Sequence, residues 1–379
     1  MKVDILIAGD FCPKNRVTNL FEKKKYNAVL GGVKDYISKA DYSIVNFECP
    51  VTTGVEKEII KCGPNLQCSE KGMEAIKWVG FNCITLANNH FLDYGKEGVE
   101  NTLLVCKKYG IDSVGGGLNL QEASNILYKE VKGIKFAIIN CCEHEFSIAT
   151  HSSPGSNPLN PIQQYYDIKV AKERSDYVII IVHGGHEHQQ HPSPRMKEVY
   201  RFFIDAGADV VVNHHQHCYS GYEVYQGKPI FYGLGNFCFD NENKRNNIWN
   251  EGYMVVLTFE KKEISYKIIP YKQCDLEPTI YICDISEFEN NLKVLNSDIK
   301  NDLRLKEIYE TFVLNSKENY LLAMEPYVGH WGGLRKRRII PSLLTKAFFL
   351  RLYGYLLCES HLDRLLLILK KMIYNEKNH

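Results

Sequence analysis

Short runs of apolar and mostly β-branched residues recur along the first two thirds of the chain. Most are four to seven residues long and end at Gly, Asn or a charged residue. This pattern is typical of buried β-strands. The runs span residues 3–8, 42–46, 83–87, 134–140, 177–182, 209–212, 230–232 and 253–259.

Helical patterns lie between several of these strands. Apolar residues recur at three- and four-residue spacing over residues 70–78, 96–109, 161–174 and 195–206. Strands that alternate with helices predict an α/β fold. From residue 222 to residue 271 the helical patterns disappear and short strands separated by Gly follow, so we expect a mixed sheet or a pair of sheets rather than a simple doubly wound fold.

The pattern changes again near residue 285. Residues 286–319 are polar and predict exposed helices, whereas the chain from Arg335 is basic and strongly apolar with scattered charges. We therefore expect a main domain over residues 1–285 and a mostly helical extension over residues 286–379. The segment from Arg335 has two interpretations: helices that pack on the main domain or on a partner chain, or a basic amphipathic segment on an anionic membrane.

Composition narrows the class of protein. The chain of 379 residues is 45% hydrophobic and 24% charged, which predicts a packed globular core, and its net charge of +1 gives no reason to expect a nucleic-acid partner. Its 13 cysteines form no C-x-x-C pair. The apolar run in MKVDILIAGDF is too short for a signal peptide. We expect reduced thiols in a cytoplasmic protein and no membrane-spanning helix.

Polar residues gather directly after six of the predicted strands. In open α/β sheets the carboxyl ends of the strands line one crevice, so we expect these residues to meet. Each position alone is weak evidence, because Gly-Asp is usually a turn and a lone His is usually a packed or solvated side chain. The six segments are Gly9-Asp10, Asn46-Phe47-Glu48, Asn88-Asn89-His90 with Asp93, His183–Glu187, Asn213–His217 and Gly233–Phe237.

The residue types fit a divalent metal site. Mn²⁺, Fe²⁺ and Zn²⁺ accept mixed imidazole and carboxylate ligands, and a carboxylate that bridges two ions suits phosphoester hydrolysis. On an extended segment His215 and His217 would share one face, with His214 on the other. We expect His186, His188 and His191 to be loop residues rather than ligands.

Six segments of the chain resemble, in order, the motifs of the bacterial capsule-synthesis CapA family. The resemblance covers roughly residues 1–275. The family has a calcineurin-like metallophosphatase fold, so the resemblance implies a four-layer αββα sandwich with mixed sheets, followed by the C-terminal helical extension. The segments are GD at 9–10, NFECPVT at 46–52, LANNHFLDYG at 86–95, HGGHE at 183–187, DAGADVVVNHHQH at 205–217 and YGLGNFCFD at 232–240.

The resemblance also implies roles for individual residues. Glu48 stands where metallophosphatases place the carboxylate that bridges two metals, and His90 resembles the histidine that protonates the leaving group, with Asp93 beside it. The full set of implied metal ligands is Asp10, Glu48, Asn89, His183, His215 and His217. The residues expected to orient ligands or to touch substrate are Asn46, Cys12, Asn88, Glu187 and Asn236.

Three departures from the family pattern stand out. Metallophosphatases have Asp-x-His in the first motif, whereas the third position here is Cys12, so the first metal would be weakly held or held partly by this thiolate. Asn213 and Gln216 replace a Gly and a Pro near the paired histidines. Many family members have an N-terminal membrane anchor, which we do not expect here.

Two hypotheses on function follow. The first is a hydrolase with two Mn, Fe or Zn ions, linked to capsule, poly-γ-glutamate or another anionic surface polymer and acting on a phosphorylated or anionic polymer-related substrate. The second is a weakly catalytic or non-catalytic subunit of a membrane polymer-synthesis or export complex, docked at the inner face of the membrane by its C-terminal segment. A purely structural metal site fits worse, because such sites usually close around one ion with Cys and His.

Overall fold

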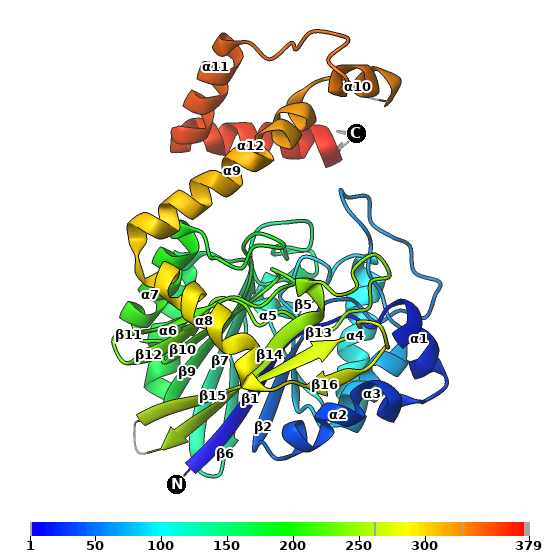
Figure 1. The fold of residues 1–379 in the computed structure, drawn as a ribbon, viewed down its shortest axis with the longest axis vertical. Helices are drawn as coiled ribbons and strands as arrows, with labels where there is room; N and C mark the ends of the chain where they lie inside the picture. The colour runs from blue at the N-terminus through cyan, green and yellow to red at the C-terminus, as the bar shows by residue number, and fades with distance from the viewer. Residues whose placement is uncertain (1, 261–262, 328, 375–379) are drawn as a thin grey trace. The chain divides into compact units, whose positions relative to one another are not determined.

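Two packed β-sheets form the centre of the protein (Figure 1). The computed structural model describes residues 2–260, 263–327 and 329–374. The first sheet has the strand order β16-β15-β14-β1-β2-β3-β4, with β13 paired to β1. Its strands are β1 Lys2–Phe11, β2 Tyr42–Phe47, β3 Cys83–Thr85, β4 Asp112–Val114, β13 Asn236–Cys238, β14 Glu251–Glu260, β15 Glu263–Gln273 and β16 Ile280–Ile282.

The second sheet has the strand order β11-β12-β10-β9-β7-β6. Both sheets are mixed: β1 runs parallel to β2 and antiparallel to β14, and β9 runs parallel to β7 and β10 while β6 is antiparallel to β7. The strands are β6 Leu127–Val131, β7 Ile134–Cys142, β9 Tyr177–His183, β10 Val210–His214, β11 Tyr222–Tyr225 and β12 Lys228–Phe231, and a separate pair is made by β5 Gly116–Gly117 and β8 Gly155–Ser156.

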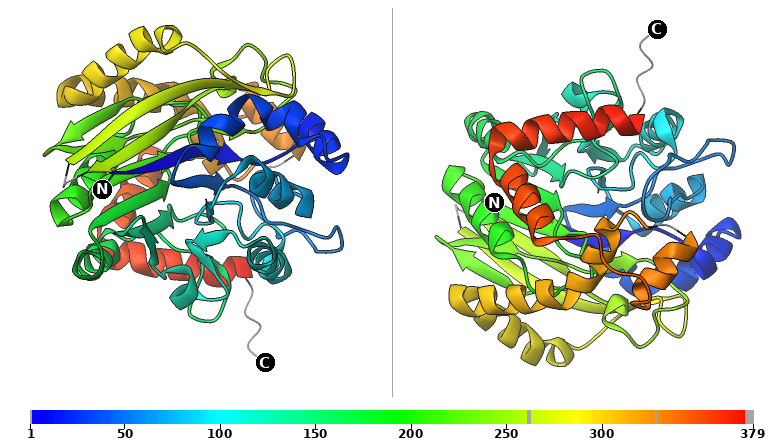
Figure 2. Two further views of the ribbon diagram at one scale, coloured as in Figure 1. Left: turned by 90° about the horizontal axis from the view of Figure 1, so that it is seen from below. Right: turned by 90° about the horizontal axis from the view of Figure 1, so that it is seen from above.

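Helices cover the outer sides of the stacked sheets (Figure 2). The first sheet shares a hydrophobic cluster with α1–α4, and the second shares one with α6 and α7. The helices of this part are α1 Asn15–Glu22, α2 Tyr26–Ser38, α3 Glu70–Val79, α4 Gly95–Tyr109, α5 Leu120–Ala123, α6 Pro161–Arg174, α7 Pro194–Ala206, α8 Ile285–Lys300 and the 3₁₀ helix η1 Ile248–Asn250.

Alternation along the strands produces these layers. On β1, Ile5 and Ile7 lie in the cluster between the sheets, whereas Leu6 and Ala8 lie in the cluster under the helices. Because successive side chains of a strand point to opposite faces, continuous apolar runs are required when both faces are buried. The prediction of an α/β four-layer sandwich with mixed sheets is confirmed.

Helix α8 differs from its prediction as an exposed helix. Its Phe288, Leu292 and Leu295 are buried in the cluster between the sheets, at spacings of four and three residues that place them on one helix face. The chain divides into two compact units, Met1–Glu307 and Ile308–His379. The first unit therefore contains α8, which the sequence pattern assigned to the extension.

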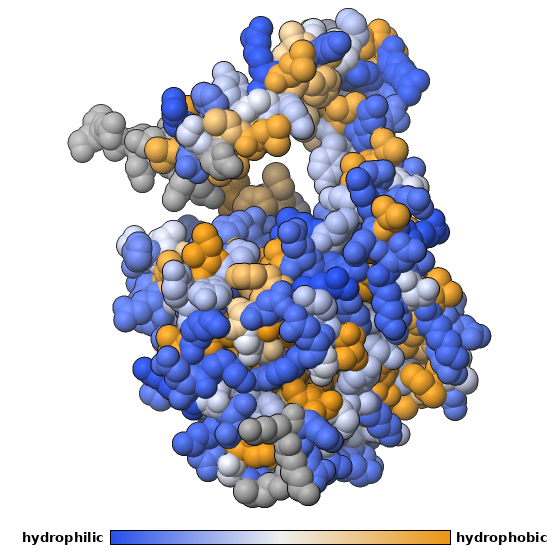
Figure 3. All heavy atoms as spheres, turned by 90° about the vertical axis from the view of Figure 1, so that its left-hand side faces the viewer, coloured by the Kyte–Doolittle hydropathy of each residue, from blue (hydrophilic) through white to orange (hydrophobic). Residues whose placement is uncertain are grey.

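The C-terminal part is helical, as α9 Asp302–Met324, α10 Gly329–Lys336, α11 Lys346–Leu357 and α12 Glu359–Tyr374. Helices α10 and α11 contain no buried residue. In Figure 3, apolar side chains lie among charged ones on the surface of these helices. Within the described residues, the search for a helix of sufficient length and hydropathy to cross a membrane finds none. Residues 328 and 375–379 of the predicted extension lie outside the described residues.

Candidate metal centre

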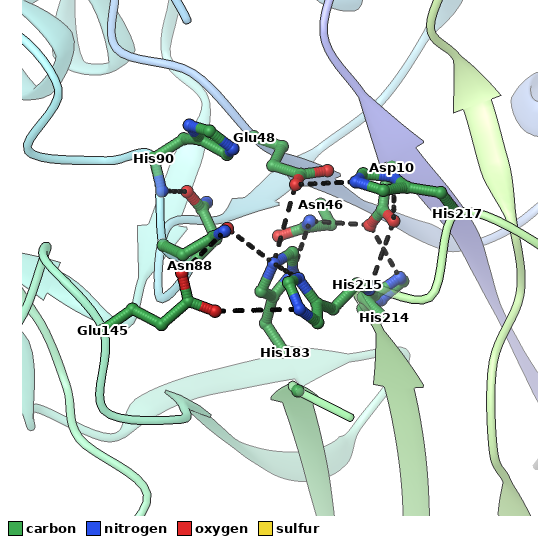
Figure 4. A network of polar contacts seen from close by, with 12 residues as sticks. Asp10, Asn46, Glu48, Asn88, His90, Glu145, His183, His214, His215 and His217 are labelled. Atoms are coloured by element: carbon green, nitrogen blue, oxygen red, sulfur yellow. Dashed lines mark hydrogen bonds and ion pairs between the residues drawn. The ribbon is translucent and has the colours of Figure 1, made fainter. Parts of the chain in front are cut away.

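The polar segments predicted to meet do lie together, at the carboxyl ends of strands from both sheets (Figure 4). Strand pairing aligns several of them directly. Asp10 on β1 is in register with Asn46 on β2 and with Asn236 on β13, and His183 on β9 is in register with His214 on β10. The site thus lies where strand ends of the two sheets face each other.

One group of possible metal ligands consists of Glu48, His183 and His215, whose ligand atoms lie within 4.8 Å of one another. His183 Nε2 is 3.6 Å from Glu48 Oε1 and 3.1 Å from His215 Nδ1. Asn89 Oδ1 lies 3.0 Å from the same His183 nitrogen. Two imidazoles, one carboxylate and one amide oxygen therefore converge on one place.

A second group consists of Asp10, Glu48 and His217. His217 Nε2 lies 3.6 Å from Glu48 Oε1, and its Nδ1 lies 3.7 Å from Asp10 Oδ2. Asn236 Oδ1 accepts a hydrogen bond from His217 Nδ1 at 2.9 Å, which leaves Nε2 to bind a cation.

Glu48 belongs to both groups and is the residue that best tests whether cations fit. Its side chain is fully buried, and within the described residues neither carboxylate oxygen has a hydrogen-bond partner. Burial, followed by the charge of Asp10, raises the pKa of Glu48 well above its usual value. A buried carboxylate without donors is strongly destabilising unless a cation neutralises it. The donor set around Glu48 therefore fits divalent metal ions.

The environment of Asp10 differs from that of Glu48. Burial acts to raise its pKa, but His214 and then His183 and His217 outweigh burial and hold the pKa of Asp10 below its usual value. Asn46 Nδ2 donates to Asp10 Oδ1 at 2.7 Å. Asp10 is thus held as a carboxylate.

His214 does not point away from the site as predicted. Its side chain is buried, and Nδ1 lies 3.3 Å from Asp10 Oδ1. The segment after β10 is not extended, because His215 and His217 have φ angles of 93° and 55° in the left-handed region. This turn brings His215 and His217 to the site, and the argument from strand alternation does not apply to them.

Neighbouring amides and a glycine hold the strand ends in place. Asn88 Nδ2 donates to Phe47 O at 2.9 Å and its Oδ1 accepts from His90 N at 3.1 Å, so it fixes the loop that carries Asn89. Gly9 allows β1 to approach the chain at Gly235, since a Cβ on Gly9 would lie 1.9 Å from Gly235 O.

His90 forms a network beside the two groups. Its Nδ1 donates to Asp93 Oδ2 at 2.6 Å, and Leu66 N donates to the same oxygen at 2.6 Å. Lys61 Nζ donates to Asp93 Oδ1 and lies 3.1 Å from His90 Nδ1. Burial lowers the pKa of His90, Asp93 acts in the opposite direction, and Lys61 lowers it further.

Two residues of the site were missed from sequence. Lys61 has an almost fully buried side chain against Asp93, and Glu145 lies 3.7 Å from His215 Nε2 through Oε1 and accepts from Asn89 Nδ2 at 3.2 Å through Oε2. Lys61 lies in the loop between β2 and α3, where no local pattern marks it, whereas Glu145 lies three residues after the end of β7 and could have been found as a strand-end residue. Glu145 is in a loop that can add a third carboxylate to the site.

Two of the residues expected to orient ligands or to touch substrate belong to neither ligand group. Cys12 belongs to neither ligand group and is buried in the cluster between the first sheet and its helices, although it lies near enough for its charge to act on Glu48. Glu187 is exposed and acts on Glu48 and His217 through its charge. The loop histidines His186, His188 and His191 belong to neither group.

The two-sheet sandwich with His, Asn and carboxylate side chains at its strand ends has the layers and the side chains expected of a calcineurin-like metallophosphatase fold. Residues 4–241 match the model of the family described as "Bacterial capsule synthesis protein PGA_cap". The chain belongs to this family, as the six motifs indicated.

Two curated relatives carry names from polymer biosynthesis. The chain is 34% identical over 247 residues to "Capsule biosynthesis protein CapA" of Bacillus anthracis, covering 63% of this chain and 60% of the relative. It is 34% identical over 248 residues to "PGA biosynthesis protein CapA" of Bacillus subtilis (strain 168), covering 62% and 64%. The matched region thus spans about three fifths of the length of these relatives.

A solved phosphatase from Mycoplasma pneumoniae is also similar in structure. It is 16% identical, the match covers 73% of this chain and 95% of that one, and the TM-score is 0.48. At this identity and TM-score the similarity supports no statement about activity.

Proposed function

We propose that the protein is a two-metal phosphoester hydrolase that acts in the biosynthesis of capsule, poly-γ-glutamate or another anionic surface polymer. The observation that carries the proposal is Glu48, a buried carboxylate without hydrogen-bond partners among the described residues, shared by two groups of possible ligands. A carboxylate that bridges two divalent ions is a recurrent feature of enzymes that hydrolyse phosphoesters.

The ligands divide between two ions. Asp10 and His217 would hold one ion, Asn89, His183 and His215 the other, and Glu48 both. Mixed oxygen and imidazole ligands suit Mn, Fe or Zn. Bound ions would supply Lewis acidity for the phosphoryl group and lower the pKa of water into the physiological range.

His90 is the proposed proton donor to the leaving oxygen. Asp93 accepts the Nδ1 proton of His90 at 2.6 Å, so this network orients the ring and would stabilise its imidazolium form, whose Nε2 proton would pass to the leaving oxygen. Lys61 and Leu66 N in turn hold the Asp93 carboxylate. Asn89, His90, His215 and His217 each retain 5–7% exposure, whereas Glu48 has none, so substrate would approach past these four side chains.

The substrate class follows from the family and from the chemistry of the site. The curated relatives are named for capsule and PGA biosynthesis. We therefore propose a phosphorylated or anionic intermediate of such a polymer as substrate.

Metal content tests the proposal most directly. Elemental analysis of untagged protein should find about two transition-metal ions per chain. The Glu48→Ala, His217→Ala double variant should lose both, whereas His191→Gln, which alters a histidine outside both groups, should keep them. Absence of metal from wild-type protein, even after reconstitution with Mn²⁺ or Zn²⁺, would refute the hydrolase. A screen of phosphomonoesters and phosphodiesters should then show hydrolysis that depends on Glu48.

A second function is favoured by the position of Cys12. Because this thiol belongs to neither ligand group, the Asp10 side of the site has one ligand fewer than the metallophosphatase pattern supplies. A weakly catalytic or non-catalytic subunit of a membrane polymer-synthesis complex would tolerate that loss. Finding one ion per chain and no phosphoester hydrolysis would favour this function over the first.

A further inference from the structure

The C-terminal helices expose an unusual amount of apolar surface. Large aliphatic and aromatic side chains that would normally be buried are more than a third exposed. An apolar groove of about 710 Å³ runs along α11 and is lined by Lys346, Phe349, Leu350, Leu352, Tyr353 and Leu356. The exposed residues of α10–α12 and their connections are Trp331, Ile339, Leu343, Phe348, Leu350, Tyr353, Tyr355, Leu356, Leu357, Leu366, Leu367, Ile368, Leu369 and Met372.

The same region is strongly basic, while the rest of the chain is acidic. Residues 329–374 contain nine Lys and Arg against two Asp and Glu, a net charge of +7. Residues 1–328 contain 36 Lys and Arg against 42 Asp and Glu, a net charge of −6. The net charge of the whole chain is close to zero because an acidic region and a basic region nearly cancel.

Some of these basic residues have structural partners and others are exposed. Arg335 Nε donates to the buried Glu325 at 2.9 Å, so it ties the last turn of α10 to the segment that follows α9. Lys336, Arg337, Lys346 and Arg351 are exposed beside the apolar side chains. Exposed cations next to Trp, Tyr, Phe and Leu are the pattern of a helix that lies in a membrane interface.

We propose that residues 329–374 dock the protein on an anionic membrane surface. The cations would bind lipid phosphates, and Trp331 of α10 together with the apolar side chains of α11 and α12 would enter the boundary between headgroups and acyl chains. Because charged residues interrupt their apolar positions, these helices would lie in the plane of the membrane interface. Docking requires neither metal nor hydrolysis, so it is independent of the proposed function.

Binding of the full chain to vesicles tests the docking. Sedimentation with vesicles of phosphatidylcholine mixed with phosphatidylglycerol should carry the protein down, and vesicles of phosphatidylcholine alone should bind it at least tenfold more weakly. A variant with Lys336→Gln, Arg337→Gln, Lys346→Gln and Arg351→Gln should lose affinity for the anionic vesicles, by roughly fivefold for each cation removed.

A matched control removes the same charge from the first unit. The exposed lysines Lys23, Lys25, Lys39 and Lys57 are changed to Gln, and this variant should bind like the wild type. Equal losses in both variants, equal binding to neutral vesicles, or no binding to either kind would each overturn the proposal.

Trp331 offers a second measurement that does not depend on removing charge. Its side chain is 60% exposed, so anionic vesicles should shift its fluorescence to shorter wavelength and shield it from acrylamide. In Trp331→Phe this change should vanish while sedimentation persists. Unchanged fluorescence in vesicle-bound wild-type protein would show that the apolar face does not enter the membrane.

Discussion

The sandwich and the C-terminal helices place their apolar residues in opposite ways. In the first unit, the alternation of side chains along the strands directs apolar residues into three hydrophobic clusters. The last residue of these clusters along the chain is Ile299, and in α9 only Leu305 is buried. In the second unit, α10 and α11 have no buried residue. Similar residue types therefore serve stability in one region and remain available for binding in the other.

The two regions also differ in the environment of their charged side chains. The sandwich is rigid enough to hold Glu48 and Asp10 inside, where water cannot solvate them, and such groups are tolerated when they serve a ligand. The C-terminal helices keep their cations in water, where they can meet an external anionic surface. Four experiments would sharpen or break this contrast.

The largest effect is expected at His90. If the hydrolase proposal holds, His90→Gln should lower the rate of hydrolysis by about 10²–10⁴-fold, because the proton donor is lost. Metal content and vesicle binding should not change. Steady-state kinetics with His191→Gln as the control measure this effect, and an unchanged rate would remove His90 from the mechanism.

Shortening an apolar side chain should lower the free energy of unfolding much more in the first unit than in the second. Ile179 is fully buried between the sheets, so Ile179→Ala should lower the free energy of unfolding by about 2–5 kcal/mol. Leu367 is 57% exposed, and Leu367→Ala should change the free energy of unfolding by no more than about 0.5 kcal/mol. Urea denaturation of both variants measures the two free energies of unfolding. Similar losses in the two variants would contradict the difference between the units.

A smaller effect is expected at Glu145. Because Glu145 Oε1 lies 3.7 Å from His215 and Oε2 accepts from Asn89, Glu145→Gln should weaken metal binding by about tenfold. Titration of metal-free protein measures the affinity. Glu198→Gln on α7, an exposed control, should bind metal as the wild type does; equal affinity of the Glu145 variant would place this carboxylate outside the site.

The smallest effect is expected from removing the second unit. A chain that ends at Glu307 retains the three hydrophobic clusters and both ligand groups. Its free energy of unfolding should stay within about 0.5 kcal/mol of the full chain, and its metal content should be the same. Aggregation of the truncated chain or loss of its metal would show that the helices support the sandwich.

Much of the fold could be predicted because the strands are buried on both faces. The apolar run at residues 177–182 corresponds to β9 Tyr177–His183, and the pattern at residues 161–174 to α6 Pro161–Arg174. Helices α1 and α2 were not predicted. The buried face of α8 was also missed, because its apolar residues are spaced among Asn, Glu and Lys.

The candidate site was predictable where its residues follow strands. Asp10, Glu48, Asn89 and His183 meet because the carboxyl ends of strands in both sheets face one crevice. Lys61 reaches the site through tertiary packing, and His215 and His217 reach it through a left-handed turn; neither the packing nor the turn leaves a periodic signal in the sequence. Glu145 was missed although it lies three residues after β7. Whether the proposed ligands bind metal stays a prediction.

The left-handed backbone at His215 and His217 has a consequence for protein engineering. A non-glycine residue in this region costs of order 1 kcal/mol, and glycine would relieve it. A selection for thermal stability alone would therefore favour His215→Gly and His217→Gly, and both substitutions would remove a proposed metal ligand. At these two positions, stability favours glycine and metal binding favours histidine.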